Sequence, residues 1–220
     1  MAPRMTRGLP AAVLIATSIF AASCTRYVDA APVAAQDPGV GLAIGAGDTA
    51  CTSVEAPLTD IDPLDEGEPV LRIPQPQGWK RYTDMDDDLF RFTMSNVDLV
   101  TDDFAPTVVV TLESKAGIVD PAVVFEQQLQ SLEKGFGATE VTATKVVHCG
   151  LPAERIEYIT PPIEPVGALP AQVLITVMQT EDRTYAATVT TQTDNPRDKT
   201  YQQDTEEILG GFQMLAPGQG

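Results

Sequence analysis

The sequence is poor in the residues from which most catalytic and metal sites are built. Its 220 residues include a single histidine, His148, and three cysteines. A histidine metal cluster needs several imidazoles and a serine hydrolase needs a histidine beside its nucleophile, so both classes have little to build from. The sequence also lacks a G-x-S-x-G nucleophile elbow, a G-x-G-x-x-G loop and a Walker loop. We therefore expect no catalytic residue, no metal site and no cofactor.

Positive charge is scarce as well. Fourteen Lys and Arg residues stand against 31 Asp and Glu residues, which gives a net charge of −17. Nucleic-acid binding depends on cations that release counterions from phosphates, and anionic lipid headgroups attract the same side chains. We therefore expect no nucleic-acid partner, and we interpret the acidity as the solubilising surface of a globular protein.

The apolar run near the N terminus is short. It covers the 14 residues from 9 to 22, fewer than the roughly 17 to 25 that a membrane-spanning helix needs. Arg4 and Arg7 precede it and small residues follow it, which is the pattern of a cleaved secretory signal. We predict that residues 1–23 are removed, and the loss of both arginines then lowers the net charge to −19.

The residues at the end of this run, Phe20-Ala-Ala-Ser-Cys24, resemble a bacterial lipobox. In a lipobox the cysteine receives a diacylglyceryl group and becomes the new N terminus. Two acyl chains anchor a protein stably where one binds only marginally, so we predict attachment to the membrane through Cys24. The alternative is an ordinary signal peptide with an incidental cysteine after it.

If lipid occupies Cys24, an even pair of cysteines remains. Disulfides persist outside the cytosol, so we predict a bond between Cys51 and Cys149. Its loop of 99 residues would stabilise the fold by at most about 4.7 kcal/mol in the chain-entropy model. The alternative is two buried free thiols.

Composition divides the exported chain into three parts. Residues 24–50 are rich in Ala, Pro, Gly and Asp, with Tyr27 as the only aromatic residue, and predict a flexible tether with a reach of roughly 25 to 30 Å. Residues 51–215 are long enough for one domain with a sizeable core, and residues 216–220 form a tail. We expect a single domain that stands off the membrane.

Seven stretches of this domain alternate or cluster apolar residues in the manner of strands. An irregular acidic lead-in, 60–68, precedes them, and Pro74 and Pro76 predict an edge position or an early end for the first. The run 171–178 is apolar on both faces, so we expect both faces to be covered. The seven predicted strands are 68–74, 89–94, 106–112, 140–147, 153–159, 171–178 and 184–191.

Two amphipathic helices are predicted from capping patterns. One begins at Asp120-Pro121 and closes at Lys134-Gly135, with Phe136 folding back on its apolar face; the other begins at Asn195-Pro196. Seven strands with two inserted helices predict an α+β fold, in which a mainly antiparallel sheet of about six or seven strands is sandwiched with the helices.

Three local patterns suggest chemistry but have simpler explanations. His148 precedes Cys149, yet successive side chains of a strand point to opposite faces, so a thiol–imidazole pair is unfavourable and a hydrolase remains a remote alternative. A calcium loop needs an acidic or amide ligand at its fifth position and Gly at its sixth, but the acidic run 60–65 has Leu64 and Asp65 there, and the run 84–88 has Asp88 followed by Leu89. We interpret both runs as solvated loops.

Three stretches of the domain resemble the LpqN/LpqT lipoprotein family of mycobacteria and related actinobacteria. They are Glu68–Trp79, Pro106–Pro121 and Gly150–Tyr158, and the resemblance covers roughly residues 66 to 215. It implies a Mog1/PsbP-like α/β/α sandwich, an outer-leaflet lipoprotein of the envelope, association with envelope lipids or proteins, and no established catalytic residues.

Two functions follow for a lipid-anchored, non-enzymatic protein on the outer face of the cytoplasmic membrane or cell envelope. In the first, an apolar cleft for an acyl chain or envelope glycolipid is lined by Trp79, Phe90 and Phe92. The alternative for these three aromatic residues is packing in the core without any cleft. In the second, the Pro-rich loop 160–165 or the acidic surface docks an envelope or transporter protein.

Overall fold

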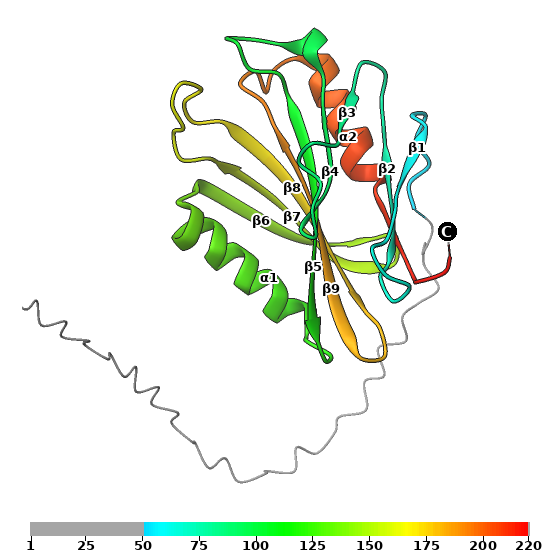
Figure 1. Cartoon of the computed structure of the whole chain (residues 1–220). Coiled ribbons are helices and arrows are strands. Elements are labelled where there is room, and N and C mark those ends of the chain that lie inside the picture. The colour runs from blue at the N-terminus through cyan, green and yellow to red at the C-terminus, as the bar shows by residue number, and fades with distance from the viewer. Residues whose placement is uncertain (1–50, 220) are drawn as a thin grey trace, which may run out of the picture. The chain divides into compact units, whose positions relative to one another are not determined.

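The computed structural model describes residues 51–219 (Figure 1). The predicted signal, the tether and Cys24 lie outside the described residues. The described elements are β1 (Leu58–Ile61), β2 (Val70–Pro74), β3 (Lys80–Tyr82), β4 (Phe90–Ser95), the 3₁₀ turn η1 (Val97–Leu99), β5 (Thr107–Ala116), α1 (Pro121–Gln130), the π-helical segment η2 (Ser131–Phe136), β6 (Thr139–His148), β7 (Leu151–Ile159), β8 (Pro170–Gln179), β9 (Arg183–Gln192), α2 (Lys199–Gly211) and β10 (Gln213–Leu215).

These strands form two antiparallel sheets. The large sheet has the order β3-β4-β5-β9-β8-β7-β6, and the small sheet has the order β1-β2-β10. All seven predicted strands are present, and the predicted α+β class is confirmed. The strands that the sequence did not reveal, β1, β3 and β10, have only three or four residues each, which is too short for a clear alternation of side chains.

The first predicted strand meets one of the two alternatives expected for it. β2 ends early, at Pro74, and it is the middle strand of the small sheet rather than an edge strand. Its partner β10 pairs only with residues 70–72, so the missing N–H group of Pro74 removes no hydrogen bond from that ladder. The acidic lead-in is also partly regular, because β1 occupies its beginning.

Buried side chains fill two cores on opposite faces of the large sheet, as the placement of the helices in Figure 1 shows. β8 contributes to both, since Val173 and Ile175 face α1 whereas Leu174 faces α2. The prediction that both faces of this strand are covered is therefore confirmed. The α1 core includes Phe125, Ile156, Tyr158, Val177 and Ala186; the α2 core includes Phe92, Val108, Val110, Val189, Tyr201, Ile208 and Phe212.

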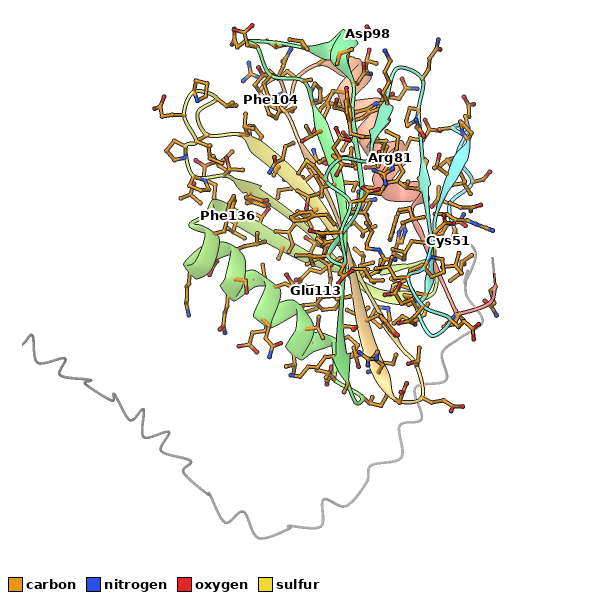
Figure 2. All side chains as sticks on the ribbon, viewed as in Figure 1. Cys51, Arg81, Asp98, Phe104, Glu113 and Phe136 are labelled. Atoms are coloured by element: carbon orange, nitrogen blue, oxygen red, sulfur yellow. A yellow bond between two sulfur atoms is a disulfide. The ribbon has the colours of Figure 1, made fainter. Side chains whose placement is uncertain are left out.

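Helix α1 begins as predicted, but the helical stretch that it opens, α1 followed by η2, ends later than predicted. Asp120 accepts a hydrogen bond from the N–H group of Ala122 at 2.9 Å, with Pro121 in the first turn. The chain then continues through η2 to Gly137, whose φ of 84° closes the helix in the left-handed conformation that glycine favours. The predicted closure at Gly135 is therefore wrong. Phe136, at this end of α1 in Figure 2, packs edge to face on Tyr158 with ring centroids 6.3 Å apart.

Helix α2 begins three residues after the predicted Pro196. Its cap is Asp198, whose carboxylate accepts a hydrogen bond from the N–H group of Tyr201 at 2.9 Å. Asn195 and Pro196 instead form a turn before the helix, closed by a bond from the N–H group of Asp198 to the carbonyl of Asn195. Two capping residues lie close together here, and local sequence alone does not decide which one starts the helix.

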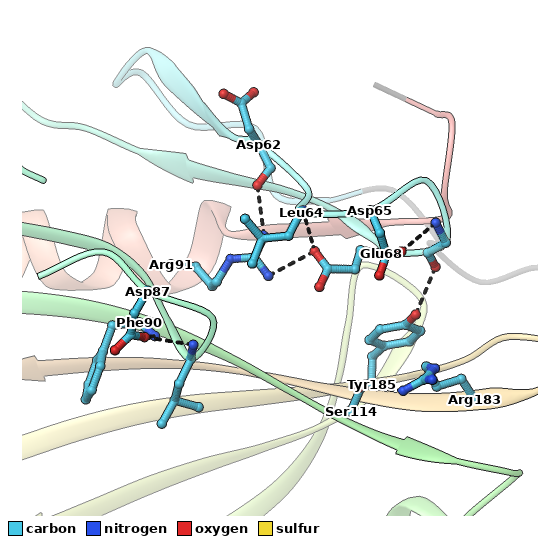
Figure 3. Close-up of polar contacts among 12 residues, drawn as sticks. Asp62, Leu64, Asp65, Glu68, Asp87, Phe90, Arg91, Ser114, Arg183 and Tyr185 are labelled. Atoms are coloured by element: carbon cyan, nitrogen blue, oxygen red, sulfur yellow. Dashed lines mark hydrogen bonds and ion pairs between the residues drawn. The ribbon is translucent and has the colours of Figure 1, made fainter.

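A buried ion pair fastens the acidic loop between β1 and β2 to the large sheet (Figure 3). Arg91 of β4 contacts the Glu68 carboxylate at 2.9 Å and donates a hydrogen bond to the carbonyl of Asp62 at 2.9 Å. Its side chain is 3% exposed and that of Glu68 is 15% exposed. Tyr185 of β9 adds a hydrogen bond to the carbonyl of Gly67 at 3.0 Å. The loop is thus part of the folded domain.

We expect Glu68→Gln to lower the free energy of unfolding by about 3 kcal/mol, because it leaves a buried guanidinium without a counter-charge. The matched control is Asp60→Asn, which breaks the exposed ion pair between Arg72 and an Asp60 side chain that is 67% exposed, at a cost below about 1 kcal/mol. Urea denaturation of both variants measures the difference. Equal costs would show that the Arg91 pair is not a structural anchor.

Candidate binding site

The hairpin of β6 and β7 closes with a two-residue turn. Cys149 and Gly150 have φ values of 50° and 78°, the two successive positive values that a tight type I′ hairpin turn requires. The structure contains the disulfide that was predicted between Cys149 and Cys51, which is labelled in Figure 2. This bond fastens the beginning of the described chain to the end of β6.

His148 and Cys149 do not form a catalytic pair. The Cys149 sulfur is bonded to Cys51, and the Nε2 atom of His148 lies 2.7 Å from the carbonyl oxygen of Phe212. Because that oxygen can only accept, Nε2 carries the proton. Burial lowers the pKa of His148, with a smaller lowering from Arg155, although the bond to the carbonyl opposes the change. The imidazole is therefore a neutral structural group.

A groove of about 660 Å³, here called the α2-side groove, lies between β6, β7 and α2. Arg155 forms an ion pair with Glu206 at 3.0 Å across it. Glu207 accepts hydrogen bonds from the N–H groups of Glu55 and Ala56 at 2.7 and 2.6 Å, which fix the incoming chain to α2. The groove therefore has three carboxylates against one guanidinium. Its lining includes Glu55, Val146, His148, Arg155, Glu206 and Glu207.

A second groove, of about 440 Å³, lies on the other face of β6 and is here called the α1-side groove. The first turn of α1 forms one wall and the ends of β6 and β7 form the other. Its lining is largely apolar, and Lys145 is its one cation. Val147 borders it with 75% of its surface exposed. The lining includes Pro121, Phe125, Lys145, Val146, Val147 and Pro152.

The two grooves meet at the last residues of β6. Val146 and Val147 line both of them. Since β6 is the end strand of the large sheet, nothing described in the sheet lies beyond it. A charged groove and an apolar groove are therefore brought together along one sheet edge, and we take this region as the candidate binding site.

A buried carboxyl lies beside this edge. Glu154 of β7 is 3% exposed, and its Oε2 atom has no hydrogen-bond partner among the described residues. It pairs with Lys145 on β6 and Ile175 on β8, so it shares the face that α1 covers. Burial raises the pKa of Glu154, and Lys145 opposes the rise.

The aromatic residues proposed for a lipid cleft do not share one surface. Trp79 is 3% exposed, and its indole N–H group donates to Asp204 at 2.8 Å within the core. Phe92 is also in the core, beneath the Arg81 guanidinium at 4.1 Å from its ring centre. Phe90 and Phe92 do border one groove, of about 360 Å³, but Asp60, Asp62, Asp86, Asp87, Arg81 and Arg91 line it too.

The acidic runs form local contacts. Asp86 pairs with Arg81, and Asp87 accepts hydrogen bonds from the N–H groups of Leu89 and Phe90. In the part of the chain that the structure describes, no group of three or more His, Cys, Asp or Glu side chains is placed to hold a metal ion. The Pro-rich loop 160–165 connects β7 to β8, as a hairpin connection would.

Sequence reasoning missed both Val147 and Glu154. A signal for Glu154 was present, because it alternates with Ile156 and Tyr158 and so shares their buried face. No local signal marks Val147, which follows another valine in the same strand. Among residues 51–219, no helix has the length and apolar character to cross a membrane.

We expect Glu154→Gln to stabilise the protein by on the order of 1 kcal/mol at pH 7. A carboxyl whose pKa is raised by folding contributes its full share of stability below its unfolded pKa, and this share is lost as the pH rises through the folded pKa. The amide of Gln does not ionise, so the variant does not lose this stability. The gain should shrink between pH 7 and pH 4 in chemical denaturation. The control Glu157→Gln changes a residue of β7 that is itself exposed, and it should change stability by less than about 0.5 kcal/mol. A pH-independent effect at Glu154 would contradict this explanation.

Comparison with known proteins identifies a fold. No protein-family model and no curated protein sequence matches the chain. Among solved structures, that of LpqN, involved in cell envelope biogenesis of Mycobacterium tuberculosis, matches with a TM-score of 0.56 and 15% identity, over 72% of this chain and 91% of LpqN. The Saccharomyces cerevisiae Ran-binding protein Mog1p gives a TM-score of 0.44 and 12% identity, over 73% of this chain and 97% of Mog1p. The chain therefore shares the α+β fold of LpqN, as the sequence resemblance implied.

Proposed function

We propose that this protein is a non-catalytic binding module of the cell envelope, a member of the LpqN/LpqT family held at the outer face of the membrane by lipid on Cys24. The lipobox-like sequence supports the anchor, and the disulfide agrees with an exported domain. The likeness to LpqN supports a place in the envelope. The observation that carries the binding role is the meeting of two grooves at the exposed end of β6.

The proposal leaves out catalysis because of the state of the two most reactive candidates. The single histidine donates to a main-chain carbonyl, and the neighbouring cysteine is consumed in a disulfide. Neither can act as a general base or nucleophile without rearrangement. The geometry of the site instead supports recognition.

Of the two ligand classes expected from the sequence, a protein segment fits the site better. The α2-side groove is charged, and its carboxylates suit a cationic partner. The second candidate is an acyl chain of an envelope lipid or glycolipid, which is favoured by the apolar walls of the α1-side groove around Phe125 and Val147. This groove replaces the cleft first expected around Trp79.

Acylation of Cys24 can be tested by metabolic labelling with a clickable fatty acid. We expect wild-type protein and the control Thr25→Ala to be labelled and found with membranes, and Cys24→Ala to lose both properties, because the thiol is the attachment point. Equal labelling of wild type and Cys24→Ala would refute the anchor.

The ligand class can be tested by native mass spectrometry of exported Cys24→Ala protein, which is purified without detergent. We expect the spectrum to show the mass of the polypeptide alone. A protein segment can fill both grooves, whereas an acyl chain would fill only the α1-side groove and leave the charged α2-side groove empty. A stoichiometric lipid adduct that Val147→Asp abolishes, and that the exposed-site control Val97→Asp retains, would assign the α1-side groove to the acyl chain instead.

A further inference from the structure

The two edges of the large sheet differ in length. β3, at one edge, has three residues, whereas β6, at the other, has ten. Long free edges invite pairing with another chain, and proteins normally shorten or cover them. Within residues 51–219, β6 pairs only with β7, and no other described segment forms a main-chain hydrogen bond with its outer side. β6 also contains no proline.

The main-chain groups that face outward follow from the hairpin turn. His148 and Leu151 flank the two-residue turn, so they form a hydrogen-bonded pair, and such pairs alternate along an antiparallel ladder. The N–H and C=O groups of Val147, Lys145 and Ala143 therefore point away from β7. The same alternation, followed through β7 to β8, predicts that the carbonyl of Pro170 points toward β9. This carbonyl does accept a hydrogen bond from the N–H group of Thr193, at 3.3 Å.

The side chains along this edge are accessible. Residues 142–145 are exposed, and Val147 has the largest exposed fraction among the large apolar residues described, at 75%. In an antiparallel sheet, large apolar side chains normally lie on a face that the core covers. The exposure of Val147 at the point where both grooves meet marks this end of β6 as a contact surface.

An added strand would send alternate side chains into the two grooves. A residue opposite Val147 would lie on the α1 face, in the apolar groove beside Phe125 and Pro152. Its two neighbours, opposite Val146 and His148, would lie on the α2 face, where three carboxylates stand against Arg155. Apolar and basic residues in alternation match these surroundings.

We infer that β6 accepts an extended segment of a partner protein as an additional strand, with basic side chains in the α2-side groove and apolar side chains in the α1-side groove. This inference rests on the proposed binding function and names its partner class. A second copy of the chain fits less well, because its β6 would offer Thr142, Thr144 and Val146 to the acidic groove, and no cation. An acyl chain would leave the outward main-chain groups unpaired.

The test uses mature Cys24→Ala protein and a fluorescein-labelled peptide, Lys-Val-Lys-Val-Lys-Val-Lys. We expect saturable binding in fluorescence anisotropy, at least tenfold tighter than that of the peptide Lys-Lys-Val-Val-Val-Lys-Lys, which has the same composition and charge. Equal binding of the two peptides would reduce the interaction to general charge attraction and overturn the inference.

Protein variants test the edge directly. Val147→Pro removes an outward N–H group and leaves the ladder with β7 intact, and proline is tolerated at such edge positions. We expect it to weaken binding at least tenfold, while Val147→Thr stays within threefold of wild type. Circular dichroism and the unfolding midpoint verify that both variants fold. Unchanged binding by a folded Val147→Pro protein would contradict strand addition.

Peptides N-methylated along one edge or the other provide a test that leaves the protein unaltered. We expect methylation of one set of alternate residues to abolish binding, and methylation of the other set to be tolerated, because only one edge of the added strand meets β6. Equal effects would overturn strand addition, as would displacement of the peptide by lauric acid or dimerisation through this edge in sedimentation. The fatty-acid labelling of Cys24 would be unaffected by such a failure.

Discussion

Burial of the large sheet on both faces is the constraint on which the rest of the structure depends. Helix α1 covers one face, and α2 with the small sheet covers the other. Side chains of β8 and β9 consequently pack into both cores. The margins of the sheet differ, because β6 at one edge is long and β3 at the other is short.

The same constraint explains the treatment of buried polar groups. Arg91 is paired with Glu68, and Trp79 donates to Asp204, so these groups keep partners inside the fold. Glu154 differs from them, since its Oε2 atom has no hydrogen-bond partner among the described residues and burial raises the pKa of this carboxyl. A neutral carboxyl is the less costly form at such a position. Glu154 pairs across the ladder with Lys145, the one cation of the α1-side groove, on the hairpin that carries the candidate site.

The disulfide holds the segment before β1 beside the end of β6, and this segment forms one wall of the α2-side groove. By joining Cys51 to Cys149, it brings the segment that precedes β1 against the end of β6. Glu207 of α2 then binds the N–H groups of Glu55 and Ala56. The α2-side groove is thus lined by three parts of the chain, which are the segment before β1, the β6–β7 hairpin and α2. Its carboxylates come from the first of these parts, with Glu55, and from the last, with Glu206 and Glu207.

The sequence by itself determined every strand of the large sheet except β3, the start of α1 and the pairing of two cysteines. These depend on alternation, capping and counting, which are local or compositional properties. Only the tertiary structure decided that Trp79 is a core residue, that Gly137 closes the first helix, and that Val147 is exposed. Exposure depends on which distant element covers a side chain. Val146 and Val147 are equivalent in sequence, and they differ only because α2 and its neighbours cover one face of this edge while α1 stops short of covering the other.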